Sequence, residues 1–161
     1  SAGWLGFDND EALCARITEN TGAPATTSIL ANNDLFRRHG VGKFGLITPY
    51  TDDVQTRIRD NYQAAGFNCM AERHLGISDN YSFSNVTQDQ VEAMCREVAE
   101  EGAEAISIIC TNMRGANLAQ RLEAELGVTV YDSISVVVLR ALELAGVNAK
   151  RLQGWGRIFA L

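Results

Sequence analysis

Hydrophobic and polar positions along the chain form blocks that predict helices and strands in alternation. The runs at 43–48 and 105–110 are almost uniformly apolar, as strands buried on both faces of a parallel sheet are. Residues 91–98 and 118–126 instead carry apolar side chains at helical spacing, and a glycine follows soon after each block. The alternation predicts an α/β fold in which helices flank a parallel sheet.

Other blocks complete the pattern. Further helices are expected at 9–20, 28–39, 51–66 and 134–145, and further strands at 23–27, 67–75 and 128–131. The tail at 154–159 is typical of a turn followed by a short strand. Thr87 and Gln90 have the spacing of a capping box, which marks the start of the helix through 98.

Composition agrees with a globular protein and excludes several partners. The chain has 161 residues, of which 46% are hydrophobic and 21% charged, as in ordinary globular domains. Its net charge is −6 and its bases are scattered, so nucleic acid is not an expected partner. Apolar runs such as Ile134–Leu139 are too short to cross a membrane. No signal peptide is visible, and we expect a cytoplasmic location.

Four cysteines stand at 14, 69, 95 and 110 without a CxxC pair, and His39 and His74 are the only histidines. A zinc site is therefore not expected, and we expect reduced thiols. Cys110 differs from the other three because it ends an apolar strand before a polar turn. Backbone N–H groups and a following helix N-terminus would stabilise a thiolate there. Position alone leaves both a reactive and a structural interpretation open.

In open parallel sheets, ligands bind beyond the carboxyl ends of the strands. The rule selects residues 48–51, 76–80 and 110–112. Tyr50 could donate a hydrogen bond from its hydroxyl or its N–H to a bound carboxylate, or it could simply pack. No glycine-rich phosphate loop and no GxSxG motif is present.

Three more polar residues belong to these strand ends. By position, Asn80 is a turn residue. Thr111 and Asn112 could cap the next helix, or they could line an anion-sized pocket beside Cys110, since caps and anion sites use the same donors.

Five short motifs stand in a familiar order. They are GAPATT at 22–27, TPYT at 48–51, GISDN at 76–80, CTN at 110–112 and GWGR at 154–157. Together they resemble the aspartate/glutamate racemase superfamily, and within it the branch of maleate cis–trans isomerases and arylmalonate decarboxylases. The resemblance covers nearly the whole chain.

The resemblance implies two pseudo-symmetric α/β lobes with the active site in the cleft between them, and neither a metal nor an organic cofactor. Each lobe presents one strand-end residue to the substrate. Both are cysteines in racemases and isomerases, whereas arylmalonate decarboxylase has a glycine at one position. Cys110 matches the second-lobe cysteine. Tyr50 and Asn80 match substrate-carboxylate contacts, and Thr111 and Asn112 match residues whose N–H groups hold an oxyanion.

The sequence departs from the family pattern at its start. Ser1 matches the loop that follows the first catalytic cysteine, so that cysteine and the first strands of lobe one would precede it. Ser1 is accordingly expected among the substrate-binding residues. The resemblance implies that the first lobe is incomplete. Residues 1–31 would be its remainder, 32–130 a complete second lobe, and 131–161 a return segment to lobe one.

The resemblance implies a cofactor-independent isomerase or racemase that acts on a small carboxylate or dicarboxylate through a cysteine thiolate, as maleate isomerase does. The CTN sequence favours this function, because a Cys-Gly-Gly sequence is expected in the decarboxylase. Two alternatives remain: a lyase like arylmalonate decarboxylase, and a non-catalytic fragment that binds a small anion. Relatives are often dimers or larger, which makes a homo-oligomer a further expectation.

Overall fold

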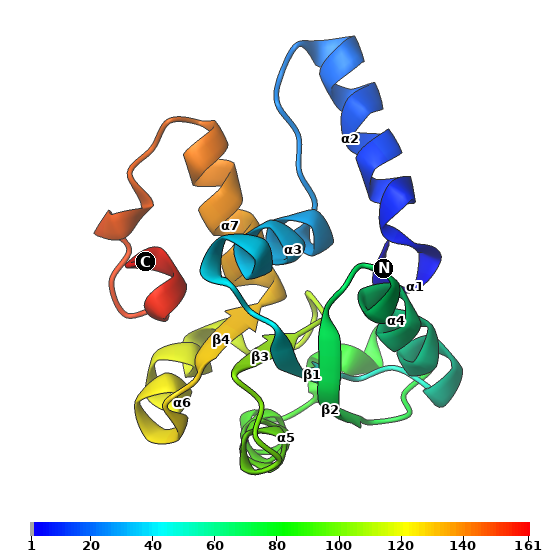
Figure 1. Ribbon diagram of the computed structural model, residues 1–161, viewed down its shortest axis with the longest axis vertical. Coiled ribbons are helices and arrows are strands. Elements are labelled where there is room, and N and C mark those ends of the chain that lie inside the picture. Colours follow the sequence, from blue (N-terminus) through cyan, green and yellow to red (C-terminus); the bar gives the residue numbers. More distant parts are fainter. Residues whose placement is uncertain (1) are drawn as a thin grey trace.

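Four parallel strands form one sheet in the order β2-β1-β3-β4 (Figure 1). The strands are β1 (Lys43–Thr48), β2 (Asn68–His74), β3 (Ala105–Ile108) and β4 (Thr129–Asp132). This computed structural model describes residues 2–161, so the expected role of Ser1 lies outside the described residues. The parallel sheet and its helices confirm the predicted fold class.

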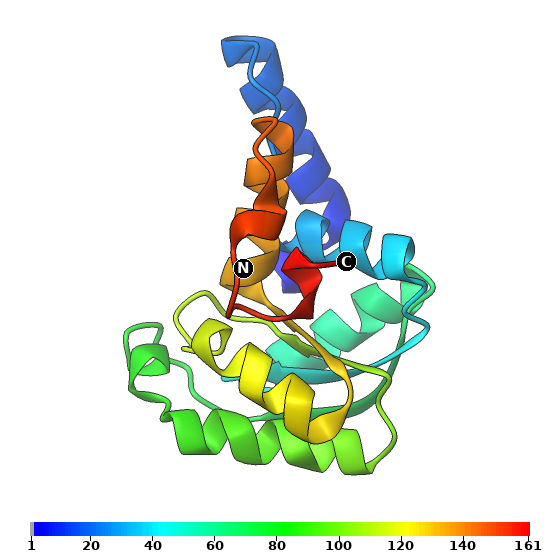
Figure 2. The same ribbon diagram turned by 90° about the vertical axis from the view of Figure 1, so that its left-hand side faces the viewer.

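Helices cover both faces of the sheet (Figure 2). Side chains of α3, α4 and α7 build one apolar core with the sheet, and those of α5 and α6 build a second core on the other face. The α-helices are α1 (Ala2–Leu5), α2 (Phe7–Thr21), α3 (Ser28–His39), α4 (Asp52–Ala64), α5 (Gln88–Glu100), α6 (Ala119–Leu126) and α7 (Ser133–Leu144). Short 3₁₀ helices are η1 (Ser82–Asn85), η2 (Ala116–Leu118), η3 (Ala149–Arg151) and η4 (Arg157–Phe159).

Local capping explains several helix starts. Thr87 and Gln90 form the predicted capping box of α5. Thr27 caps α3 by accepting a hydrogen bond from the N–H of Leu30, so the cap lies one residue before the start of the helix. Each cap satisfies backbone donors that would otherwise lack a partner at the helix end.

The close packing of α5 on β1 depends on a residue without a side chain. A Cβ atom on Gly45 would lie 2.6 Å from a methyl carbon of Val98, closer than real Cβ contacts. Gly45 in β1 therefore lets α5 approach the strand, and this approach holds the second core tightly against the sheet.

Two of the expected strands are absent from the described residues. Residues 23–27 form an irregular segment, because Pro24 lacks a backbone N–H and no described strand lies alongside to pair with. In the tail, η4 replaces the expected strand. Its segment packs on α6, where Glu123 accepts a hydrogen bond from the N–H of Arg157 at 2.7 Å.

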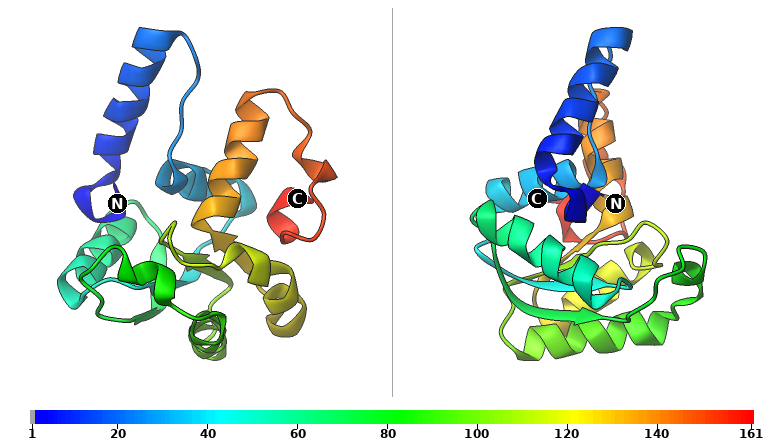
Figure 3. Two further views of the ribbon diagram at one scale, coloured as in Figure 1. Left: turned by 180° about the vertical axis from the view of Figure 1, so that it is seen from behind. Right: turned by 90° about the vertical axis from the view of Figure 1, so that its right-hand side faces the viewer.

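The helix α2 stands away from the sheet, and the far end of α7 extends in the same direction (Figures 1 and 3). Leu13 and Ile17 of α2 are 45% and 40% exposed, whereas Asp10 of the same helix is buried. Among the described residues no helix is long and apolar enough to cross a bilayer. The division into lobe segments stays a prediction.

Candidate functional site

The order of the strands places a topological switch point between β1 and β3. From β1 the chain passes to β2 on one side, and it then returns to β3 and β4 on the other side. The loops that leave β1 and β3 therefore diverge, and ligands in such sheets bind where they do. Tyr50 follows β1 and Cys110 follows β3, and the N–H of Ile109 bonds to the carbonyl of Ile47 at 2.9 Å. The two candidate residues thus flank the switch point.

Cys110 is fixed at the end of β3 by burial and by a backbone turn. It is 5% exposed and belongs to the core between the sheet and the helices α5 and α6. Its carbonyl accepts a hydrogen bond from the N–H of Met113 at 3.2 Å, which closes a turn, and the Met113 side chain is buried as well. Tyr50 packs against the same core. The four cysteines of the chain are free thiols.

Thr111 and Asn112 are exposed on the turn that follows Cys110. Within residues 2–161, their backbone amides form no hydrogen bond. Two consecutive unpaired N–H groups beside a thiol can hold an anion, as the backbone does in other anion-binding turns. This geometry agrees with the expected oxyanion role.

The turn after Cys110 does not lead directly into an α-helix. The turn leads first into η2, and α6 begins only at Ala119 with Leu118 in the capping position. Thr111 and Asn112 therefore do not cap α6.

The segment 76–85 borders the same turn. The side-chain amide of Asn112 donates to the carbonyl of Asn80 at 3.2 Å, so Asn80 and Asn112 are brought together. Phe83 of η1 packs its ring edge-on to Tyr50, with ring centroids 5.3 Å apart. The segment thereby connects the turn after β3 with the turn after β1.

The backbone N–H and carbonyl of Tyr50 both form hydrogen bonds within the chain. Its N–H donates to the hydroxyl of Thr48 at 3.3 Å, and its carbonyl accepts from the N–H of Gly76 at 3.0 Å. Of the two donors considered from the sequence, the N–H is thus engaged within the chain.

A chain of polar side chains behind Tyr50 was missed by the sequence analysis. Thr48 donates to Gln55 at 2.7 Å, Gln55 donates to Glu72 at 2.6 Å, and His74 lies 2.9 Å from the same carboxylate oxygen. His74 also contacts Asp52 at 2.7 Å. Burial lowers the pKa of His74, but the hydrogen bonds that its ring N–H groups donate to the two carboxylates outweigh this effect, and the net shift of the pKa is upward.

Asp132 is a second residue whose environment the sequence did not reveal. It ends β4 opposite Ile108, and its Oδ1 caps α7 by accepting hydrogen bonds from the N–H groups of Ile134 and Ser135. Its Oδ2 is buried and has no hydrogen-bond partner among the described residues. Burial raises the pKa of this carboxyl to about 6, although the two N–H groups oppose the shift.

Packing around Asp132 reaches the Cys110 turn. A Cβ atom on Gly115 would lie 2.6 Å from Oδ2 of Asp132. Only glycine fits this position, and the turn therefore lies directly against the buried carboxyl. The contact between Gly115 and Asp132 could not be predicted from the sequence, because it depends on how β3 and β4 pair.

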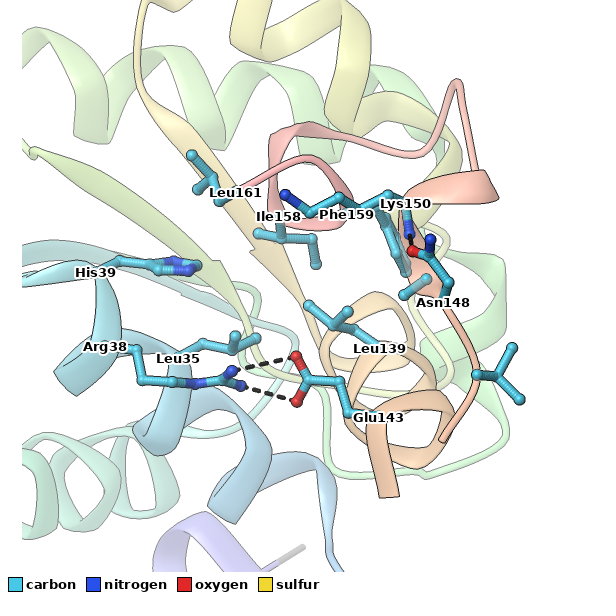
Figure 4. A pocket seen from close by; sticks show the side chains of 12 residues that line it. Leu35, Arg38, His39, Leu139, Glu143, Asn148, Lys150, Ile158, Phe159 and Leu161 are labelled. Atoms are coloured by element: carbon cyan, nitrogen blue, oxygen red, sulfur yellow. Dashed lines mark hydrogen bonds and ion pairs between the residues drawn. The ribbon is translucent and has the colours of Figure 1, made fainter. Parts of the chain in front are cut away.

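A separate hollow lies away from these strand ends (Figure 4). It has a volume of about 220 Å³ and lies between α3, α7 and the C-terminal residues, where Arg38 and Glu143 form a bidentate pair. None of the expected site residues lines it. The hollow is therefore distinct from the Cys110 region.

Comparisons with known proteins identify the family of this chain. A family model described as arylmalonate decarboxylase matches residues 3–159. The chain belongs to that family. It is 29% identical over 150 residues to arylmalonate decarboxylase of Bordetella bronchiseptica, which covers 92% of this chain and 62% of the relative. It is 23% identical over 128 residues to maleate isomerase of Alcaligenes faecalis, covering 79% and 51%. The chain thus spans only part of the length of both relatives.

Solved structures of the family share the fold. A crystal structure of arylmalonate decarboxylase superimposes with a TM-score of 0.87 at 28% identity, over 99% of this chain and 71% of that one. A maleate cis–trans isomerase of Nocardia farcinica gives a TM-score of 0.88 at 20% identity, over 98% and 66%. The resemblance to the branch of decarboxylases and maleate isomerases is confirmed.

Proposed function

We propose that the protein is a cofactor-independent enzyme of small dicarboxylates that isomerises its substrate through the thiolate of Cys110, as maleate isomerase does. Both curated relatives are enzymes, one a decarboxylase and the other an isomerase. Their names alone do not choose between the two reactions. The choice made here rests on the residues beside the thiol.

The observation that carries the proposal is the placement of Cys110 at the switch point, next to the unpaired amides of Thr111 and Asn112. A nucleophile needs a neighbouring site that can hold the negative charge it creates. Here donors occur on the same turn, and the phenol of Tyr50 follows the adjacent strand. The proposal gives Tyr50 and Asn80 the role of holding substrate carboxylates.

The proposed reaction conserves atoms and charge. The Cys110 sulfur attacks one alkene carbon of the cis substrate, and the π-electron pair moves through the other carbon onto its carboxylate as an enediolate. The amides after Cys110 hold this charge. Rotation about the resulting single bond, return of the electron pair and cleavage of the C–S bond release the trans isomer and the thiolate. No proton is gained or lost overall.

A second candidate is a lyase of the arylmalonate decarboxylase type. The matching family model and the 29% identical relative favour it. In this reaction a carbon–carbon bond breaks, carbon dioxide leaves, and the electron pair forms an enediolate. A thiol at Cys110 then donates its proton to the carbon. The same donors serve both reactions, so the substrate decides between them.

The test is turnover of a substrate panel by the protein and its Cys110→Ala variant. We expect conversion of maleate to fumarate, which ¹H NMR resolves by the vinyl signals, and a loss of at least about 10³-fold in the variant. Cys95→Ala is the matched control, because it removes a thiol buried elsewhere in the same core.

Other outcomes would change the assignment. Release of carbon dioxide from phenylmalonate without action on maleate would support the lyase instead. Unchanged turnover in Cys110→Ala would overturn both mechanisms. Saturable binding of the dicarboxylates without any turnover would support the third alternative, an anion-binding protein.

A further inference from the structure

The loops beyond the carboxyl ends of the strands contain a single strong cation. Residues 49–51, 75–87 and 109–118 follow β1, β2 and β3, and Arg114 is their only lysine or arginine. His74 ends β2, but it already lies between the carboxylates of Glu72 and Asp52. A small dicarboxylate at this edge would therefore meet one unassigned positive charge.

Arg114 has no carboxylate partner among residues 2–161. Its one hydrogen bond there is a long one, 3.4 Å, from Nη2 to the carbonyl of Ser84. Of the other eleven arginines, five form ion pairs with carboxylates among the described residues, namely Arg38, Arg73, Arg96, Arg121 and Arg140. A guanidinium carries five N–H donors, and nearly all those of Arg114 stay available.

The direction of the Arg114 side chain follows from its neighbours. Met113 is 2% exposed and points into the core, whereas Asn112 and Arg114 both reach the segment 76–85. That segment contacts Tyr50 through Phe83. Gly115, the next residue in the chain, packs against Asp132, and this contact restrains the backbone beside Arg114.

We propose that Arg114 binds a carboxylate of the substrate and makes the site selective for dianions. The inference rests on the function proposed above and adds to it the residue that selects the charge. Guanidinium and carboxylate form two parallel charge-assisted hydrogen bonds, which neither an asparagine nor a phenol can offer. The amides of Thr111 and Asn112 then hold the charge that develops during the reaction, and Arg114 joins Tyr50 and Asn80 in holding the carboxylate charge that is present throughout.

The experiment is calorimetric titration with maleate and with its monoamide, maleamate, of the protein and three variants. In Arg114→Gln we expect the maleate affinity to fall about 10- to 100-fold, while the maleamate affinity changes far less. Arg114→Lys keeps the charge and should recover part of the loss. Arg151→Gln removes the same charge from η3, an exposed segment of the tail, and should leave both affinities unchanged.

The outcomes separate this inference from the proposed function. If the protein binds maleate and Arg114→Gln binds it equally well, the role of Arg114 is overturned and the function stands. An equal loss for maleate and maleamate would assign Arg114 to tethering the segment 76–85 and would also overturn it. If the unaltered protein binds neither maleate nor phenylmalonate, both the proposed function and this role fail.

Discussion

At the scale of single residues, chemistry that depends on residue type was predictable, and chemistry that depends on packing was not. Cys110 was predictable because a cysteine at the end of an apolar strand before a polar turn is visible in the sequence. The raised pKa of Asp132 was not, since it arises from burial beside Gly115 and Ile108. Asp132 caps α7 with only one of its oxygens.

The raised pKa of Asp132 predicts how the free energy of unfolding changes with pH. Its pKa is raised from 3.8 to about 6, so between these values the folded state binds the proton more tightly than the unfolded chain. The group therefore stabilises the fold at low pH, and this contribution, about 3 kcal/mol at most, is lost as pH rises through 6. Urea unfolding measured from pH 4 to pH 7 checks the slope.

The matched variant is Asp132→Asn, because asparagine caps a helix nearly as well as aspartate but does not titrate. The free energy of unfolding of the protein, relative to this variant, should decrease across the window. A constant difference between the two proteins would show that Asp132 has an ordinary pKa.

At the scale of elements, the unit formed by β1, α4 and β2 shows which features hydrophobic periodicity predicts and which it does not. It predicts the elements themselves, but not the hydrogen bonds between their side chains. Hydrophobic periodicity predicted its strands and helix to within a few residues. The polar chain from Thr48 through Gln55 to Glu72 could not be predicted, because its members are 7 and 17 residues apart and meet only through strand register. This chain fixes the turn that carries Tyr50.

Replacing Thr48 by valine tests that element. Valine keeps the shape but removes the hydroxyl, which takes away the donor to the buried side-chain oxygen of Gln55 and the acceptor of the Tyr50 N–H. We expect a loss of about 1–3 kcal/mol in the free energy of unfolding, measured by urea titration. Thr48→Ser keeps the hydroxyl and serves as the control. An equal loss in both variants would attribute the effect to the methyl group and not to the hydrogen bonds.

At the scale of the whole molecule, the parallel sheet was predictable but its strand order was not. Alternating strands and helices are compatible with several orders, and the order β2-β1-β3-β4 is what places Tyr50 and Cys110 together. The exposure of the apolar side chains of Leu13 and Ile17 on α2 was also not predicted. Helical spacing in the sequence marks an apolar face without showing what that face contacts.

The arrangement as a whole distinguishes Cys110 from the other cysteines. Burial raises the pKa of Cys69 to about 11 and that of Cys95 to about 12, and burial followed by the charge of Asp10 raises that of Cys14. A raised pKa leaves little of the reactive thiolate at neutral pH. Cys110 instead adjoins unpaired amide donors at the switch point.

The most direct test of the account is therefore the rate at which iodoacetamide labels each cysteine near neutral pH, read by peptide mass spectrometry with and without maleate or phenylmalonate. The account predicts that Cys110 is labelled faster than Cys14, Cys69 and Cys95, and that a bound dicarboxylate slows labelling at Cys110 alone. Uniformly slow labelling of all four thiols, or labelling of Cys110 that neither dicarboxylate slows, would contradict it.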